Sequence, residues 1–481
     1  MNKLPILGIV GFLCMVFSLS VIPPLLLSLF YADGEAVHFA LSFLLIHITG
    51  LLLWLPARGK IGEFRRRDGF IIVTLFWVVL SLLSAIPFMI GPHLTFIDAF
   101  FEAVSGFTTT GATVIIGLDT LPPSVLYYRG QLQWLGGMGL IVLAVAIMPM
   151  LGIGGAQLYR AEAPGPMKEE KLKPRLAETA RSLWLIYVGL TIACALGYWV
   201  AGMSLFDAVV HSYTTVSTGG FSTHDASLGY FNSVAIELIA IVFMLAGGIN
   251  FAIHYRAAAS LSLRSYWRDE EVRSFLLFII GALIVIALML WLFEEYGYFH
   301  EALTNSLFEI VSVITSTGFG TADFSTWPSF LPLLLIFISF IGGCGGSTAG
   351  GLKVSRVLLV IKQGGHEIGL LIHPRAVKPL RIGGHVLAPR VSQAIWGFFS
   401  VYILVFALFT LLMMAAGLDQ VSAFSAVATC INNLGPGLGE VAVTFASVST
   451  SGKLIGVLAM LLGRLEIFTV LVILAPAFWR D

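Results

Sequence analysis

Ser306-LFEIVSVITST-Gly318 is one of four similar segments that decide the fold of this 481-residue chain. The other three are Ala99-FFEAVSGFTTT-Gly111, Asp207-AVVHSYTTVST-Gly219 and Ala423-FSAVATCINNL-Gly435. Each is an apolar run of helical character that passes into small or hydroxylated residues and then a glycine. Four copies at long intervals indicate an internal repeat of one supersecondary unit.

The composition places the repeat in a membrane. The chain is 58% hydrophobic and 11% charged, with a mean hydropathy of +0.93, which excludes a soluble globular domain. About 20 apolar residues cross a bilayer as a helix. The sequence predicts ten spans, at 4–30, 36–57, 69–91, 128–150, 182–202, 231–254, 274–297, 327–361, 392–416 and 453–478.

The four repeated segments are too short to cross the membrane. The parts at 97–107, 205–215, 303–314 and 420–430 are predicted to be re-entrant pore helices. We therefore expect an all-α polytopic protein with pseudo-fourfold symmetry around one ion pore. Its predicted parts are two N-terminal helices (1–68) and four span–pore-helix–span repeats, at 69–160, 161–258, 259–390 with an interrupted inner helix, and 391–481.

Basic residues predict the orientation. Of the 27 Lys and Arg residues, 22 lie in the segments 58–67, 160–181, 256–273 and 353–390, which join one repeat to the next. Cytoplasmic loops carry the excess of positive charge. These loops and both termini are therefore expected in the cytoplasm, and the glycine loops outside.

The glycine loops have the character of an ion filter. Ser316-Thr317-Gly318-Phe319-Gly320 is similar to the Thr-Val-Gly-Tyr-Gly loop of potassium channels, whose carbonyls replace the ion's hydration shell. Glycine reaches the backbone conformations that such a loop needs, and pore-helix C-termini would add partial negative charge. Glu102 and Glu309 could attract cations, but bonds to the backbone behind the filter are the preferred interpretation.

A gate is predicted in the eighth span. The run Gly342-Gly343-Cys344-Gly345-Gly346-Ser347-Thr348-Ala349-Gly350-Gly351 cannot form a stable helix in lipid. It lacks the Gly-Lys-Ser/Thr of a nucleotide-binding P-loop. Arg464 stands in the apolar last span and is expected to face this gating loop. Glu466 is a disfavoured partner for it, because positions two apart do not share a helix face.

The chain resembles the TrkH subunits of bacterial potassium uptake systems, within the TrkH/KtrB/HKT superfamily. The resemblance rests on Thr-Thr-Thr-Gly-Ala-Thr (108–113), Ser-Thr-Gly-Gly-Phe-Ser (217–222), Ser-Thr-Gly-Phe-Gly-Thr-Ala-Asp (316–323), Asn-Asn-Leu-Gly-Pro-Gly (432–437) and Pro-Ala-Phe-Trp-Arg (476–480). It implies potassium, K+, as the transported ion. It implies K+ binding by the carbonyls of Thr110, Gly111, Thr218, Gly219, Thr317, Gly318, Leu434 and Gly435.

Further expectations follow from the same resemblance. Sodium-preferring relatives often have Ser in place of the first filter glycine, so Gly111 favours potassium. The matching arginine in the family faces the gate, as expected for Arg464. The resemblance also implies a bacterial inner-membrane location, a homodimer, and a cytosolic TrkA-like ring that binds NAD and ATP or ADP. This chain itself is expected to bind no nucleotide and no nucleic acid.

Three other classes of protein fit the sequence less well. A proton- or sodium-coupled potassium symporter needs a relay of intramembrane acids, and few are present, although coupling stays open. A membrane enzyme needs clustered His, Asp, Glu or Cys, but the ten histidines and four cysteines have no catalytic or metal-ligand spacing. A scaffold leaves the four loops unexplained. We therefore expect no enzyme activity.

Overall fold

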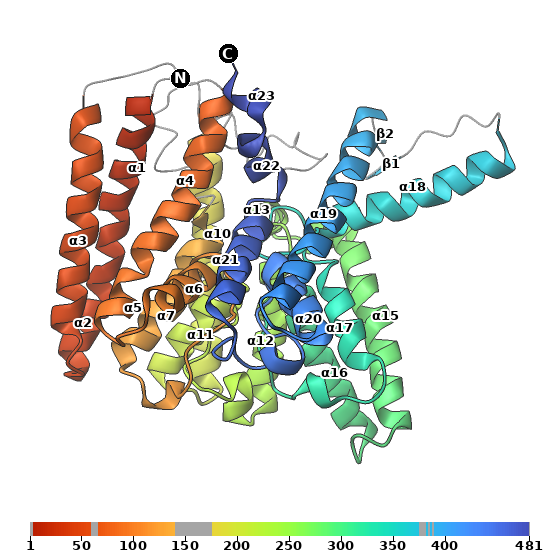
Figure 1. Ribbon diagram of the computed structural model, residues 1–481. Coiled ribbons are helices and arrows are strands. Elements are labelled where there is room, and N and C mark those ends of the chain that lie inside the picture. The colour runs from red at the N-terminus through yellow and green to blue at the C-terminus, as the bar shows by residue number, and fades with distance from the viewer. Residues whose placement is uncertain are drawn as a thin grey trace.

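The computed structural model describes residues 3–58, 66–139, 176–374, 381–382, 385–386 and 389–480. Helices form nearly all of the regular structure in these residues (Figure 1). The exception is a two-residue antiparallel pair, β1 (Arg381–Ile382) with β2 (His385–Val386). The predicted all-α fold class is therefore confirmed.

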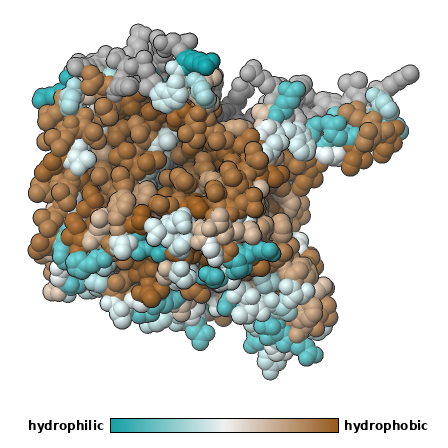
Figure 2. Space-filling model, in the orientation of Figure 1, coloured by the Kyte–Doolittle hydropathy of each residue, from teal (hydrophilic) through white to brown (hydrophobic). Residues whose placement is uncertain are grey.

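Among the described residues, six helices are long and apolar enough to cross a membrane, and they match six of the ten predicted spans. They are Leu4–Tyr31, Ala36–Ala57, Arg67–Ile90, Ala180–Val200, Glu270–Leu292 and Gln393–Ala415. Only 17% of the most apolar window in Gln393–Ala415 is buried, and 28% in Glu270–Leu292. Such broad exposed apolar surface, visible as a brown band in Figure 2, requires a lipid environment.

Three of the four remaining predicted spans are not single helices. Two are bent pairs, Val234–Gly248 with Phe251–Ser260 at 102° and Thr450–Arg464 with Phe468–Leu474 at 109°. The eighth is interrupted between Ser339 and Val354, where the glycine run lies. The fourth begins with Pro123–Gly137, and its predicted second half lies outside the described residues, as does most of the basic segment 160–181.

The N-terminal spans form a pair at one edge of the molecule (Figure 1). It consists of α1 (Lys3–Ser18), η1 (Leu19–Val21), α2 (Ile22–Tyr31), α3 (Ala36–Trp54) and η2 (Leu55–Ala57). A Cβ added to Gly11 would lie 2.6 Å from the Gly50 carbonyl oxygen, and one added to Gly50 2.8 Å from that of Gly11. These glycines let α1 and α3 approach closely, as small residues do in membrane helices.

Each repeat supplies an outer helix, a pore helix and an inner helix. The outer helices are α4 (Arg66–Ser84), α10 (Leu176–Val200), α15 (Glu270–Leu292) and α19 (Pro389–Ala415). The pore helices are α6 (Phe96–Phe107), α11 (Leu205–Val216), α16 (Phe299–Ile314) and α20 (Gln420–Ile431). The inner helices are α7 (Pro123–Gly137), α12 (Val234–Gly248), α17 (Leu331–Ser339) and α21 (Thr450–Arg464).

Shorter elements join these helices. They are α5 (Ile86–Ile90), η3 (Leu118–Thr120), η5 (Ser227–Phe231), α13 (Phe251–Ser260), α14 (Arg264–Arg268), η6 (Phe324–Thr326), η7 (Gly439–Val441), α22 (Phe468–Leu474) and α23 (Pro476–Trp479). After the interruption, α18 (Val354–Ile372) projects from the body (Figure 1). The pore helices lie in the half of the molecule away from both chain ends.

Candidate ion filter and gate

The four glycine loops follow the C-terminal ends of the pore helices and lie next to one another. Side chains of Thr95, Ser204 and Asp419 cap three of these helices at their N-termini by accepting backbone N–H bonds. Each helix ends directly before its glycine loop. Because a helix carries partial negative charge at its C-terminus, this arrangement favours a cation beside the loops.

The four loops share one backbone conformation. The second residue after each helix has a positive φ: Thr109 (57°), Thr218 (53°), Ser316 (53°) and Asn433 (52°). The next amide donates a 2.8 Å hydrogen bond to the carbonyl five residues earlier: Thr110 to Ser105, Gly219 to Thr214, Thr317 to Ser312 and Leu434 to Thr429. Positive φ is uncommon outside glycine. Its recurrence therefore identifies equivalent positions without reference to sequence similarity.

A positive-φ glycine follows at the next equivalent position. These glycines are Gly111 (82°), Gly220 (78°), Gly318 (79°) and Gly435 (97°). The second loop thus aligns one residue later than predicted, and Gly220, not Gly219, corresponds to the other glycines. The reason is that α11 ends at Val216, which sets the register. The adjacent glycine pair hid this register in the sequence.

The loops follow one another in a closed order. A Cβ added to each glycine would point at a carbonyl oxygen of the next loop: Gly111 at Gly219 (2.2 Å), Gly220 at Thr317 (1.9 Å), Gly318 at Leu434 (2.0 Å) and Gly435 at Thr110 (2.8 Å). The fourth loop returns to the first. We call the residues Thr110, Gly111, Gly219, Gly220, Thr317, Gly318, Leu434 and Gly435 the carbonyl ring. Any side chain on these glycines would collide with it.

The carbonyl ring contains all the predicted filter residues except Thr218. That residue lies one position earlier, and its hydroxyl donates to the Ser217 carbonyl at 2.7 Å and to Thr348 Oγ1 at 3.2 Å. Gly220, which the prediction omitted, takes the position of the ring glycine.

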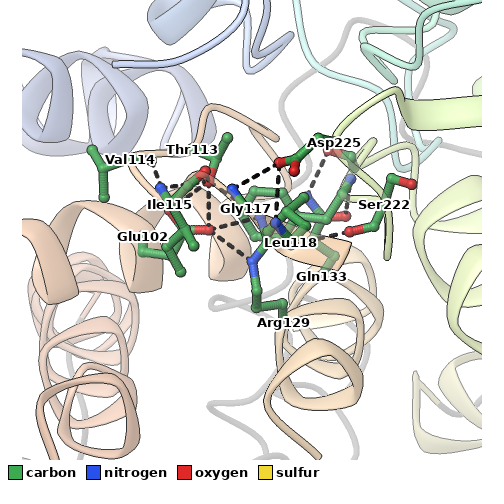
Figure 3. Close-up of polar contacts among 12 residues, drawn as sticks. Glu102, Thr113, Val114, Ile115, Gly117, Leu118, Arg129, Gln133, Ser222 and Asp225 are labelled. Atoms are coloured by element: carbon green, nitrogen blue, oxygen red, sulfur yellow. Dashed lines mark hydrogen bonds and ion pairs between the residues drawn. The ribbon is translucent and has the colours of Figure 1, made fainter. Parts of the chain in front are cut away.

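Polar groups brace the first loop from behind (Figure 3). Buried Glu102 accepts bonds from the Val114 amide at 2.9 Å, from Thr113 Oγ1 at 3.0 Å and from Arg129 Nε at 2.9 Å. Arg129 Nη1 also donates to the Ser222 carbonyl at 3.0 Å, which connects the first and second loops. The interpretation of Glu102 as a backbone brace is confirmed.

The same brace position recurs in two other loops. Glu309 accepts from the amides of Thr321 at 2.9 Å and Ala322 at 3.1 Å. His211 Nε2 lies 2.9 Å from Ser222 Oγ. Glu102, Glu309 and His211 each stand nine residues before a ring glycine, provided that Gly220 is the second one. This spacing is independent support for the corrected register.

The gating loop lies against the C-terminal ends of the pore helices α11, α16 and α20. Thr348 Oγ1 donates to the Val216 carbonyl at 3.1 Å, and the Gly350 amide donates to Ser316 Oγ at 2.5 Å. The Gly351 amide donates to the Asn432 carbonyl at 3.1 Å. The loop therefore contacts the second, third and fourth glycine loops directly. Its predicted members are Gly342, Gly343, Gly345, Gly346, Ser347, Thr348, Gly350 and Gly351.

Arg464 connects the gating loop to the first repeat. Its Nη1 donates to the Thr348 carbonyl at 3.0 Å and to Thr109 Oγ1 at 3.1 Å, and Nη2 donates to the Gly136 carbonyl at 2.9 Å. The expected contact with the loop is confirmed. Glu466 forms an ion pair with Arg356.

All four inner helices end near the gating loop, although the sequence predicted an interruption only in the third. The ends are Gly137, Gly248, Ser339 and Arg464. Helix C-termini leave carbonyls without intrahelical partners. The gating loop satisfies two of them, because Cys344 N donates to the Gly248 carbonyl at 2.8 Å and Thr348 N to that of Gly247 at 3.2 Å.

Two polar residues, of which Gln133 is fully buried, were not predicted from the sequence. Glu271 lies in the first turn of α15. Its carboxylate accepts hydrogen bonds from the backbone amides of Gly345 at 2.8 Å and Ser355 at 3.0 Å. Gln133, in α7, donates from Nε2 to the Gly219 carbonyl at 2.6 Å. The available signal for Gln133 was an amide side chain in a predicted apolar span, which it shares with Gln131.

Metal-ligand side chains do not gather in the described part of the chain, where no group of three or more His, Cys, Asp or Glu could hold a metal ion. Cys14, Cys194, Cys344 and Cys430 are buried and free.

Comparison with known proteins adds independent findings. Residues 35–480 match the family TrkH, described as a cation transport protein. The Trk system potassium uptake protein TrkH of Vibrio parahaemolyticus is 52% identical, with 99% of each chain covered. That of Escherichia coli K12 is 50% identical, with 98% of each covered. The crystal structure of the potassium transporter TrkH from Vibrio parahaemolyticus has a TM-score of 0.91 at 49% identity, covering 100% of both chains.

Proposed function

Because the chain belongs to the TrkH family of cation transport proteins, we propose that it takes up potassium across the cytoplasmic membrane through a channel-like pore. The family is one of transport proteins, not of enzymes. The relatives that share about half of its residues are named for potassium uptake.

The closed carbonyl ring is the observation that carries this proposal. Oxygens of Thr110, Gly219, Thr317 and Leu434 face the neighbouring loops in cyclic order. Such oxygens can replace the hydration shell of a dehydrated potassium ion. The pore-helix C-termini add negative potential at the same place. A cation is therefore stabilised there without any carboxylate in the ring.

We propose that the gating loop and Arg464 form the gate of this pore. The loop contacts the second, third and fourth glycine loops directly and is connected through Arg464 to the first. A guanidinium close to the ring would oppose the passage of cations while it stays bound to the Thr348 carbonyl. Opening requires that these contacts break.

The proposed cellular context follows from family membership and orientation. Both chain ends lie at the face opposite the pore helices (Figure 1), which suits cytoplasmic termini and glycine loops that face outside. The relatives are named as parts of a Trk system. We propose that this chain likewise works with a cytosolic nucleotide-binding ring of TrkA type, and as a homodimer in a bacterial inner membrane.

Ion flux into proteoliposomes that carry the purified protein tests the proposal. We expect uptake of rubidium, a potassium substitute, to exceed uptake of sodium. Gly111→Ser should relax this preference, because a Cβ there lies 2.2 Å from the Gly219 oxygen. Equal uptake of both ions, unchanged by Gly111→Ser, would contradict the filter. If neither ion enters, Arg464→Ala should restore rubidium uptake by weakening the gate.

A further inference from the structure

One loop of the carbonyl ring lacks a side chain where the other three have one. Thr110 Oγ1 lies 2.7 Å from Thr108 Oγ1, and Thr317 Oγ1 lies 2.7 Å from Thr315 Oγ1. The fourth loop has buried Leu434. The equivalent residue in the second loop is Gly219, which can neither bond nor pack through a side chain.

Gln133 occupies the missing position. A Cβ added to Gly219 would lie 2.4 Å from both Cδ and Oε1 of Gln133. The amide is fully buried, donates to the Gly219 carbonyl at 2.6 Å and accepts from the Phe221 amide at 3.0 Å. It therefore fixes the peptide groups on both sides of Gly220.

We infer that Gln133 is a positioning residue for the second loop and helps to determine the ion specificity of the carbonyl ring. The inference rests on the proposed function. Gly219 and Gly220 are adjacent glycines, so this loop is the most pliable of the four. An amide from a neighbouring inner helix replaces the local anchor that the other loops carry in their own sequence.

The hydrogen bond also changes the oxygen that a cation meets. A carbonyl oxygen has two lone pairs. The Gln133 amide donates to one lone pair of the Gly219 oxygen, which fixes the orientation of that carbonyl. The second lone pair stays available for a cation. Among the described residues, hydrogen bonds from side chains to the ring carbonyls of Thr110, Thr317 and Leu434 are absent. The ring is therefore chemically asymmetric at this point.

Rubidium and sodium uptake into proteoliposomes tests the inference. We expect Gln133→Leu, which keeps the volume but removes both bonds, to lower the rubidium-to-sodium ratio about fivefold. Gln133→Glu keeps an acceptor for Phe221 but loses the donor to Gly219, and it should lower the ratio as well. Gln131→Leu is the matched control, because Gln131 lies on the same helix but donates to the Ser20 carbonyl; its ratio should stay that of the wild type.

A compensating pair separates positioning from general damage. Gln133→Ala should lower the ratio, and adding Gly219→Thr should raise it again, because the new hydroxyl can bond Ser217 as Thr110 bonds Thr108. The φ of Gly219 is not in the left-handed region, so a side chain fits its backbone. Gly219→Thr alone should impair the protein, since it collides with Gln133.

The outcomes are distinct. A wild-type preference for rubidium that Gln133→Leu and Gln133→Glu leave unchanged would overturn the inference while the proposed function stands. A wild type without any preference would remove the carbonyl ring as a filter. If Gln133→Leu does not fold, the compensating pair decides: recovery of the ratio supports the inference, and no recovery overturns it.

Discussion

At the scale of single residues, the identity of the ring glycine in the second loop is open to direct test. Gly220 has a φ of 78°, and a Cβ on it would lie 1.9 Å from the Thr317 oxygen. We predict that Gly220→Ala abolishes selective rubidium uptake and lowers the melting temperature, because left-handed backbone alone costs about 1–2 kcal/mol for other residues. Gly189→Ala, with no atom within 4 Å of its Cβ, is the control and should behave as the wild type.

A second residue-scale prediction concerns the buried pair behind the first loop. Arg129 and Glu102 have side-chain exposures of 1% and 0% and lie 2.9 Å apart. Arg129→Leu leaves Glu102 buried without its cation, which should destabilise the protein by about 3–5 kcal/mol. Glu102→Leu combined with Arg129→Leu should melt higher than Arg129→Leu alone. Thermal unfolding in detergent compares them, and a double variant that melts lower would contradict the explanation.

Sequence similarity predicted ring residues well where helix end and glycine kept a constant distance, as for Gly111 and Gly318. It failed at Gly219 and Gly220 because either glycine satisfied the pattern. Gln133 was not predictable for another reason. Its role depends on a neighbour 86 positions along the chain, and no local signal links an amide in an apolar helix to a loop of the next repeat.

At the scale of elements, the inner helices show what composition can predict. The break after Ser339 was predicted because a glycine run cannot hold a helix. The break after Arg464 was not, since Leu465-Glu466-Ile467 has no helix breaker. Glu466 and Ile467 nevertheless have φ values of 52° and 51°. Tertiary contacts, including the Glu466–Arg356 pair, override local propensity there.

Glu271 carries the prediction at this scale. Its carboxylate holds the amides of Gly345 and Ser355, so it fastens the gating loop to α15. Charged hydrogen bonds of this kind contribute about 1.5–3 kcal/mol each, and Glu271→Leu should therefore raise basal rubidium uptake about tenfold or more. Glu271→Gln keeps an acceptor oxygen and should raise it less. If rubidium uptake by Glu271→Leu is no higher than that of the wild type, the hydrogen bonds of Glu271 do not keep the proposed gate closed.

At the scale of the whole molecule, the first two repeats are also joined at the face that carries the glycine loops. The Asp225 carboxylate accepts from the amides of Gly117 and Leu118, each at 3.1 Å (Figure 3). Asp119 Oδ1 lies 2.5 Å from His224 Nδ1, and Asp207 lies 3.7 Å from the other ring nitrogen. The contacts of Asp225 with Gly117 and Leu118 and that of Asp119 with His224 join residues about a hundred positions apart, and they hold neighbouring repeats in register.

This junction predicts a pH dependence. The hydrogen bond from His224 lowers the pKa of Asp119 below its ordinary value, and the Asp225 amide adds to the effect. A lowered pKa contributes stability that is complete above about pH 4 and is lost as pH falls through the folded-state value. The difference in melting temperature between wild type and Asp119→Asn should therefore shrink below about pH 4. A difference that stays constant from pH 6 to pH 3 would contradict this assignment.

The asymmetry at Gly219 has a consequence for how such a protein can evolve. In a pore built from four copies of one polypeptide, a single mutation changes all four subunits, so its effect on ion binding occurs four times. Here one chain contains the four repeats, and a mutation changes only one of them. In the proposed role of Gln133, one repeat lacks a side chain at Gly219 and an amide from a neighbouring helix stands in its place. A mutation in such a protein can therefore alter the ion preference by changing one of the four repeats and leaving the other three unchanged.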